Sequence, residues 1–197
     1  MIPALVLVIL TVVFRIATAL VVHGGGSSWL LNFAPLAAIA LCSAIYFPPK
    51  FRFTVPFAAL FVSDLVLNIY YGASLLDPLI LSRYVAFALV GLLGLALSRR
   101  PVSLQVIVPA SLAGSILFYG LTNAFSWLTD PGYVKNFAGL IQALTVGLPQ
   151  YGATPTWMFF RNSLASDLLF TILFFACMSF SRRAAALPAT ATRPLPN

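Results

Sequence analysis

Six long apolar runs, separated by short segments rich in glycine and proline, make up most of the chain. A membrane-spanning helix needs about 20 mainly apolar residues. The runs that reach or approach this length are roughly 3–22, 31–47, 53–72, 82–98, 103–128 and 159–181. The main breaks between them are Gly24–Gly26, Pro48–Pro49, Asp77–Pro78, Pro101 and Asp130–Gly132. The pattern predicts an all-α membrane protein, a bundle of six transmembrane helices.

The segment 136–158, between the fifth and sixth runs, has a different pattern. It carries no charge but is interrupted by glycine and proline. Asn136, Gly139, Gln142 and Thr145 recur at every third position, which is typical of a polar stripe along a short helix. We therefore expect a short re-entrant or interfacial helix here, followed by a loop over a site, and no further span.

The composition excludes several classes of protein. Of the 197 residues, 61% are hydrophobic and only 8% are charged, whereas soluble domains carry about 25% charged residues. These numbers exclude a soluble enzyme, a disordered chain and a nucleic-acid-binding domain. The formal net charge of +7 is therefore first considered as a signal of membrane topology.

The basic residues divide unequally between the two ends of a six-span bundle. One side holds seven of the eleven, namely Lys50, Arg52, Arg99, Arg100, Arg182, Arg183 and Arg193. The other side holds Arg83, Lys135 and Arg161. The positive-inside rule then predicts that both termini are cytoplasmic, in a multi-pass protein of the cell's inner (cytoplasmic) membrane. We expect one transmembrane domain, residues 1–183, and a disordered cytoplasmic tail, residues 184–197.

Polar residues in the spans concentrate in, or just above, the outer half of the bundle. Ionisable groups in spans cost about 2.5–3.5 kcal/mol each on insertion scales, so each needs a partner or a function. The candidate substrate-binding residues are Arg15, Asn32, Asp64, Asn68, Tyr71, Asn123, Arg161, Asn162 and Asp167. Asp64, Asn68 and Tyr71 share one helix face because their spacing is i, i+4, i+7.

Two interpretations of this group remain open. In the first, Arg15 pairs with one aspartate and the amides join helices. The other carboxyl group is then either protonated or paired with Arg83 or Arg161 at the outer rim. In the second, the group lines a pocket that opens outward and binds a polar solute. The sequence contains no HExxH, CxxC or GxSxG motif, so we expect no catalytic residue, cofactor or metal.

Two further patterns are weaker. Residues 62–67 and 165–170 both contain Ser-Asp-Leu, which is consistent with inverted halves of three spans each, although a match this short also arises by chance. Trp29, Trp127 and Trp157 fall at the outer ends of spans. They are typical of an interfacial aromatic belt, with a site for a flat ligand as the alternative.

Several short motifs together carry a family resemblance. They are Asn32–Leu41, Ser63–Leu65, Leu121–Asn123 with Trp127, Gly139–Leu140, and Arg161–Leu164 with Asp167–Leu169. Across roughly residues 30–180 the chain resembles an uncharacterised bacterial family of membrane transport proteins. That family is similar to the substrate-binding S components of energy-coupling factor (ECF) vitamin transporters.

The resemblance implies a six-helix bundle with cytoplasmic termini and a solute site that opens outward. The loops expected to cap this site are 23–30, 73–81 and 129–158. An ECF-type energising module is then one candidate partner, reached in many S components through an Ala-xxx-Ala pair on the first span. That pair is missing here, since Ala4 and Ala17 are followed at this spacing by Val8 and Val21. A solitary transporter therefore stays open.

A related solitary type of transporter handles cobalamin and uses a cysteine as cobalt ligand. Cys42 would take that role only if it faced the pocket. From its place inside an apolar run, we expect Cys42 to be a small buried hydrophobic residue.

The sequence thus predicts a substrate-binding integral membrane transport protein, not an enzyme, that captures a small polar, vitamin-like solute from the outer face. Arg15 and Arg161 would meet anionic groups, and Asp64 and Asp167 would meet cationic or hydrogen-bond-donating groups. The expected partners are the solute and the lipid bilayer, with no nucleic acid. The alternatives are a structural or assembly protein without a ligand, and an intramembrane aspartyl enzyme using Asp64 and Asp167.

Overall fold

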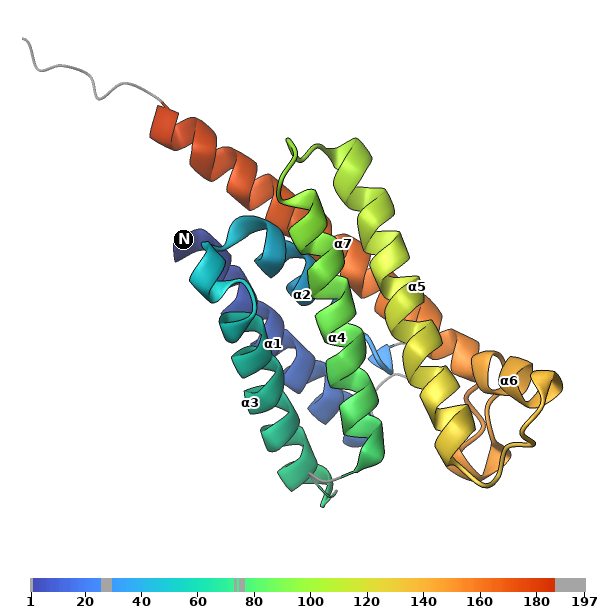
Figure 1. Cartoon of the computed structure of the whole chain (residues 1–197). Helices are drawn as coiled ribbons and strands as arrows, with labels where there is room; N and C mark the ends of the chain where they lie inside the picture. Colours follow the sequence, from blue (N-terminus) through green and yellow to red (C-terminus); the bar gives the residue numbers. More distant parts are fainter. Residues whose placement is uncertain (1, 26–29, 73, 75–76, 187–197) are drawn as a thin grey trace, which may run out of the picture.

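The computed structural model describes residues 2–25, 30–72, 74 and 77–186, and this part of the chain is helical with no strand (Figure 1). Five helices are long and apolar enough to cross a membrane. They are α1 (Ile2–His23), α3 (Thr54–Tyr71), α4 (Pro78–Leu97), α5 (Leu104–Thr129) and α7 (Thr156–Ala186). Two shorter helices are α2 (Leu36–Tyr46) and α6 (Phe137–Leu144), and short 3-10 turns cover Pro49–Phe51 and Pro149–Tyr151. The prediction of an all-α, multi-pass architecture is confirmed.

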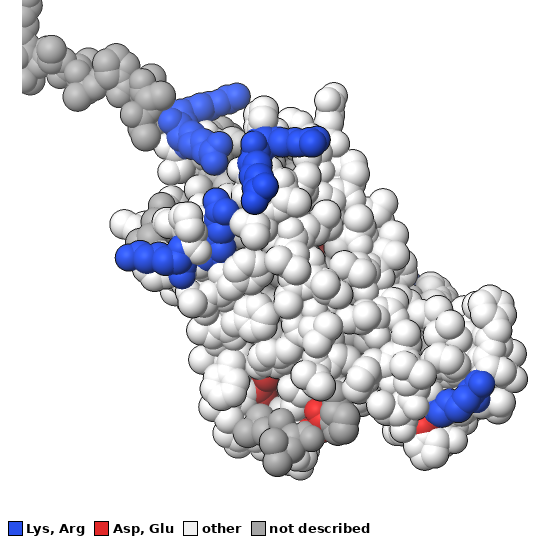
Figure 2. All heavy atoms as spheres, viewed as in Figure 1, with Lys and Arg blue, Asp and Glu red and all other residues white. Residues whose placement is uncertain are grey.

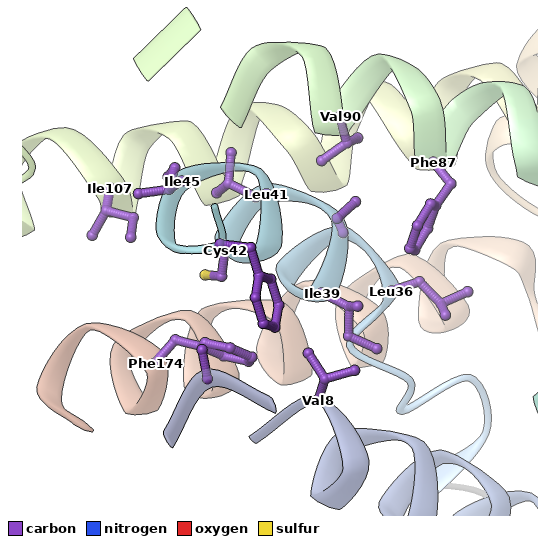
Figure 3. Close-up of a cluster of buried hydrophobic side chains, with 14 of the residues drawn as sticks. Val8, Leu36, Ile39, Leu41, Cys42, Ile45, Phe87, Val90, Ile107 and Phe174 are labelled. Atoms are coloured by element: carbon purple, nitrogen blue, oxygen red, sulfur yellow. The ribbon is translucent and has the colours of Figure 1, made fainter. Parts of the chain in front are cut away.

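Helix α2 is the centre of the bundle and the main departure from six full spans. Its 11 residues extend only about 16 Å at 1.5 Å per residue. Every residue from Leu36 to Ile45 is buried, because α4, α5 and α7 pack around it. Figure 3 shows its side chains among those of Val8, Phe87 and Phe174.

The predicted span 31–47 is helical only from Leu36. Asn32 has a φ of 56°, the left-handed conformation that interrupts a helix. Pro35 then occupies the N-cap position of α2. Residues 31–35 are mainly apolar, as in a spanning helix, but they are not helical.

Close packing of α4 on α2 depends on Gly94. A Cβ atom at this position would lie 2.5 Å from the carbonyl oxygen of Leu41 and 3.0 Å from the Cβ of Ala44. The two backbones therefore approach more closely than any residue larger than glycine allows.

The basic residues gather over one end of the molecule. Figure 2 shows most Lys and Arg atoms at the end where α1 begins and α7 ends in Figure 1, with acidic atoms mainly toward the opposite end. Lys50, Arg99, Arg100, Arg182 and Arg183 are exposed there. This separation is the one expected from the distribution of charge along the sequence.

A compact segment containing α6 connects α5 to α7 and packs against α5. The side-chain oxygen of Asn136 caps α6 by accepting a hydrogen bond from the Gly139 N–H at 2.9 Å. The Tyr119 hydroxyl donates to the Leu144 carbonyl at 2.8 Å. The helix expected within 136–158 is thus present as Phe137–Leu144.

Helix α7 continues to Ala186, three residues into the predicted tail. The rest of that tail, residues 187–197, lies outside the described residues, as do Trp29 and parts of the predicted capping loops 23–30 and 73–81.

Candidate functional site

A cavity of about 470 Å³ lies among α1, α3, α4 and α5, toward the ends of these helices that are remote from the basic patch. The segment before α2 and the start of that helix complete its wall, with Leu30–Ala34 and Leu36. Six of the nine predicted site residues line it, namely Arg15, Asn32, Asp64, Asn68, Tyr71 and Asn123. Its volume is within the range of about 300–1,000 Å³ that is typical of small-molecule sites.

Three charged side chains from three helices meet in this cavity. One carboxylate oxygen of Asp64, Oδ1, accepts from Arg15 Nη2 at 2.6 Å and from Arg83 Nη1 at 2.8 Å. Arg15 also donates to the hydroxyl of Ser63. The side chains of Arg15 and Asp64 are 8% and 3% exposed, and that of Arg83 is 31% exposed. The cluster therefore links α1, α3 and α4 through a buried ion pair and a more accessible cation.

Two buried polar atoms beside this cluster have no hydrogen-bond partner among the described residues. They are Oδ2 of Asp64 and Nδ2 of Asn68. Both side chains come from one face of α3, at the i, i+4 spacing predicted from the sequence. A buried polar group without a partner is costly, so this wall has hydrogen-bonding capacity that the protein itself leaves unused.

The remaining predicted residues of the cavity lie outside the charged cluster. Tyr71 donates its hydroxyl to the Ala19 carbonyl of α1 at 3.3 Å. Asn123 donates through Nδ2 to the Tyr119 carbonyl at 2.9 Å, one turn earlier in α5. Asn32 lies in the non-helical segment before α2 and is exposed. The cavity wall therefore reaches the surface at Asn32 and Tyr71, which is also exposed.

Asp167 lines a second, smaller cavity of about 100 Å³. Asn32 and Asn123 belong to both walls. The Asp167 carboxylate accepts from the backbone N–H of Ala38 at 2.9 Å and from the Ser115 hydroxyl at 2.8 Å. It thereby caps the N-terminus of α2, where unpaired N–H groups and the helix dipole favour a negative charge.

Arg161 and Asn162 lie outside the walls of both cavities. Arg161 donates from Nε and Nη2 to the Asn162 side-chain oxygen at 3.1 and 3.0 Å. Its guanidinium also lies 5.7 Å from the ring centroid of Trp157. Asn162 donates to the Leu31 carbonyl at 2.8 Å, so the two residues hold the segment before α2 against α7.

Arg83 lines the cavity but is not among the nine residues predicted for the site from the sequence. The structure begins α4 at Pro78, four residues before the predicted start of the span. Asp77 caps the helix by accepting from the Leu79 N–H at 2.8 Å. A capping Asp followed by Pro at the first helical position is a helix-start signal in the sequence, and it could have placed Arg83 inside the helix.

Cys42 lines neither cavity. It is fully buried, and Figure 3 shows it within the apolar cluster around α2, near Ile45 and Phe174. Cys42 and Cys177 are both free thiols. Within the described part of the chain, no group of three or more His, Cys, Asp or Glu residues is arranged to hold a metal ion.

Comparison with known proteins identifies a family. A protein family described as "Family of unknown function (DUF6580)" matches residues 1–190, nearly the whole chain. No curated protein and no solved structure matches the chain.

Proposed function

The chain belongs to this family of unknown function, and we propose that it is a substrate-binding integral membrane transport protein, similar to an ECF S component. In this proposal it captures a small polar, vitamin-like solute from the outer face of the bacterial inner membrane. The supporting observation is the cavity of about 470 Å³, whose wall combines the Arg15–Asp64–Arg83 cluster with Asn32, Asn68 and Asn123.

The proposed topology counts α2 with its preceding segment as the sixth membrane element, with both termini in the cytoplasm. The gathering of exposed basic residues at one end supports this orientation. The cavity lies toward the other end, so in this topology it opens outward. Helix α6, which packs against α5, is then a re-entrant or interfacial helix on the outer side. The protein would act either together with an ECF-type energising module or alone.

A structural or assembly protein without a ligand is the second candidate function. It is favoured by the contacts of Asp167 with the N-terminus of α2 and of Asn162 with Leu31, because these contacts join helices and need no solute. This alternative does not account for the partnerless buried atoms of Asp64 and Asn68 in the cavity wall.

An intramembrane aspartyl enzyme is less well supported. Such chemistry needs two carboxylates that share one reacting group. Asp64 is engaged by two guanidinium groups, whereas Asp167 is engaged by a helix N-terminus and Ser115. The two carboxylates thus have separate partners and line different cavities.

Mass spectrometry of small molecules that co-purify with the full-length protein tests the proposal. We expect one defined polar solute in the wild type and its loss from Asn123→Ala and Asn68→Ala, which alter the cavity wall. Asn136→Ala, in the cap of α6 outside the wall, is the matched control and should retain the solute. A preparation that is empty, and that no compound in a metabolite panel stabilises against thermal unfolding, would favour the structural role.

A further inference from the structure

The charges on the cavity wall do not balance. Among its lining residues the charged groups are Arg15, Arg83 and Asp64, which leave one positive charge in excess. Asp77 is exposed at the start of α4, outside this wall, and its carboxylate is occupied by the Leu79 N–H. Asp167 lies on the wall of the smaller cavity, where it caps α2.

The excess charge is accessible on Arg83. Arg15 is buried and bonded to both Ser63 and Asp64. Arg83 is 31% exposed and engages Asp64 through Nη1 alone. A guanidinium has five N–H donors in a planar fork that matches a carboxylate. Arg83 therefore has further N–H groups that can donate hydrogen bonds to a second oxyanion.

We propose, building on the proposed function, that the cavity selects a water-soluble solute with a single negative charge, presented as a carboxylate that binds Arg83. One negative charge on the ligand neutralises the wall, whereas a dianion reverses its sign and a cation doubles the excess. Because the cavity is partly enclosed, an uncompensated charge in it is less well solvated than in bulk water, which weakens binding. The net charge of the wall therefore discriminates among solutes by their charge, whatever contacts their neutral parts make.

The rest of the solute is neutral and polar. Asn68 offers an unused N–H donor, and Asp64 offers an unused oxygen acceptor one turn earlier on the same helix face. Both atoms are buried in the free protein, so a solute group containing a donor and an acceptor, such as an amide, would reach this pair once the two side chains rotate toward the cavity. Asp64 therefore acts toward the solute as a hydrogen-bond acceptor, because its charge is already compensated by the two arginines.

The test uses the full-length protein in detergent and a panel of matched pairs in which a carboxylate is exchanged for a primary amide. Nicotinate with nicotinamide and benzoate with benzamide are examples, supplemented by amines and dicarboxylates of similar size. Thermal stabilisation identifies binders, and calorimetry gives their Kd. We expect the binders to be monocarboxylates, with the paired amides at least about tenfold weaker.

Variants then locate the contact. Arg83→Gln removes the excess charge and should weaken the monocarboxylate at least tenfold, while Arg83→Lys keeps the charge without the fork and should have an intermediate effect. Arg161→Gln, outside the cavity, should leave the Kd unchanged. Thermal unfolding of the free variants checks that each is folded, and Arg15 remains in both Arg83 variants to pair with Asp64.

Two results would overturn the inference in different ways. If a neutral, cationic or dianionic solute binds, with a Kd that Asn123→Ala weakens and Arg83→Gln does not, the charge selection is wrong and the proposed function stands. If no water-soluble compound of any charge binds or co-purifies, the proposed function and this inference both fail.

Discussion

The carboxylate of Asp167 in α7 accepts a hydrogen bond from the backbone N–H of Ala38 in α2 at 2.9 Å, across 129 positions of sequence. The first turn of any helix has N–H groups without partners inside the helix. Because α2 begins inside the bundle, a side chain from another helix supplies the cap. The Ala38 N–H and the Ser115 hydroxyl thus give the buried carboxyl group of Asp167 hydrogen-bond partners inside the bundle.

Replacing Asp167 by Ala should destabilise the protein, because the Ala38 N–H loses its side-chain acceptor and the Ser115 hydroxyl keeps only the Ser111 carbonyl. We expect the free energy of unfolding to fall by about 1–3 kcal/mol, measured by thermal or denaturant unfolding in detergent. Asp167→Asn is the matched control, since it keeps an oxygen that can face Ala38, and its loss should be clearly smaller. Equal losses for the two variants would contradict the role of this oxygen as the cap of α2.

Gly94→Ala should destabilise the bundle at the contact of α4 with α2. The added methyl group would meet the Leu41 carbonyl oxygen at 2.5 Å, so the helices must separate, at a cost of about 1–3 kcal/mol for an overpacked core. Gly120→Ala in α5 is the control, because a Cβ there meets no atom within 4 Å. Its effect should be neutral or slightly stabilising, since alanine favours helix. A lower Tm for Gly120→Ala than for Gly94→Ala would refute the close approach.

The loop after α5 should loosen in acid. The Tyr151 hydroxyl, at 2.6 Å, and the Gly132 N–H, at 2.8 Å, lower the pKa of Asp130 below its usual value of 3.8, with Lys135 contributing. A carboxyl whose pKa is lower in the folded state stabilises that state fully above its unfolded pKa. This contribution is lost as the pH falls below 3.8 and through the folded pKa.

Hydrogen exchange of segment 130–152, corrected for intrinsic rates, should therefore show less protection at pH 3 than at pH 5. Asp130→Asn should remove this difference, and Tyr151→Phe should reduce it, because the phenolic hydroxyl is the largest cause of the lowered pKa. A wild-type difference that persists in Asp130→Asn would assign it to another group.

Cysteine labelling tests the orientation. Lys50 and Gln150 are exposed at opposite ends of the bundle. In a Cys177→Ala background, with Cys42 left buried, we expect Gln150→Cys to react with a membrane-impermeant maleimide in intact bacterial cells. Lys50→Cys should react only after permeabilisation. The reverse labelling pattern would show that the topology is inverted and that the cavity opens toward the cytoplasm.

Much of the helical architecture was predictable, because hydropathy indicates which segments are buried in an apolar environment. The predicted run 3–22 became Ile2–His23, and 103–128 became Leu104–Thr129. Hydropathy does not distinguish a helix from an extended segment buried by its neighbours, so the late start of α2 at Leu36 was missed. The left-handed φ of Asn32 depends on the surrounding bundle and leaves no unambiguous trace in the sequence.

The candidate site was predicted in part for the same physical reason. Arg15 and Asp64 were detectable because an ionisable group in an apolar run requires a partner, and they pair as the structural interpretation expected. Arg161 met the same criterion but contacts Asn162 and Trp157, since polarity alone does not give the direction of a side chain. Placing Arg83 required the correct start of α4, which depended on the interpretation of Asp77 and Pro78.

The short length of α2 has a consequence for the origin of the cavity. A hydrocarbon core about 30 Å thick accommodates two segments of this length end to end. Helix α2 therefore covers about half of this thickness. The other half, beyond the N-terminus of α2, is bordered by Leu30–Ala34, which are part of the cavity wall. The cavity therefore lies where a longer α2 would continue. Substitutions that extended α2 toward Leu31 would fill the cavity without altering any of its charged residues.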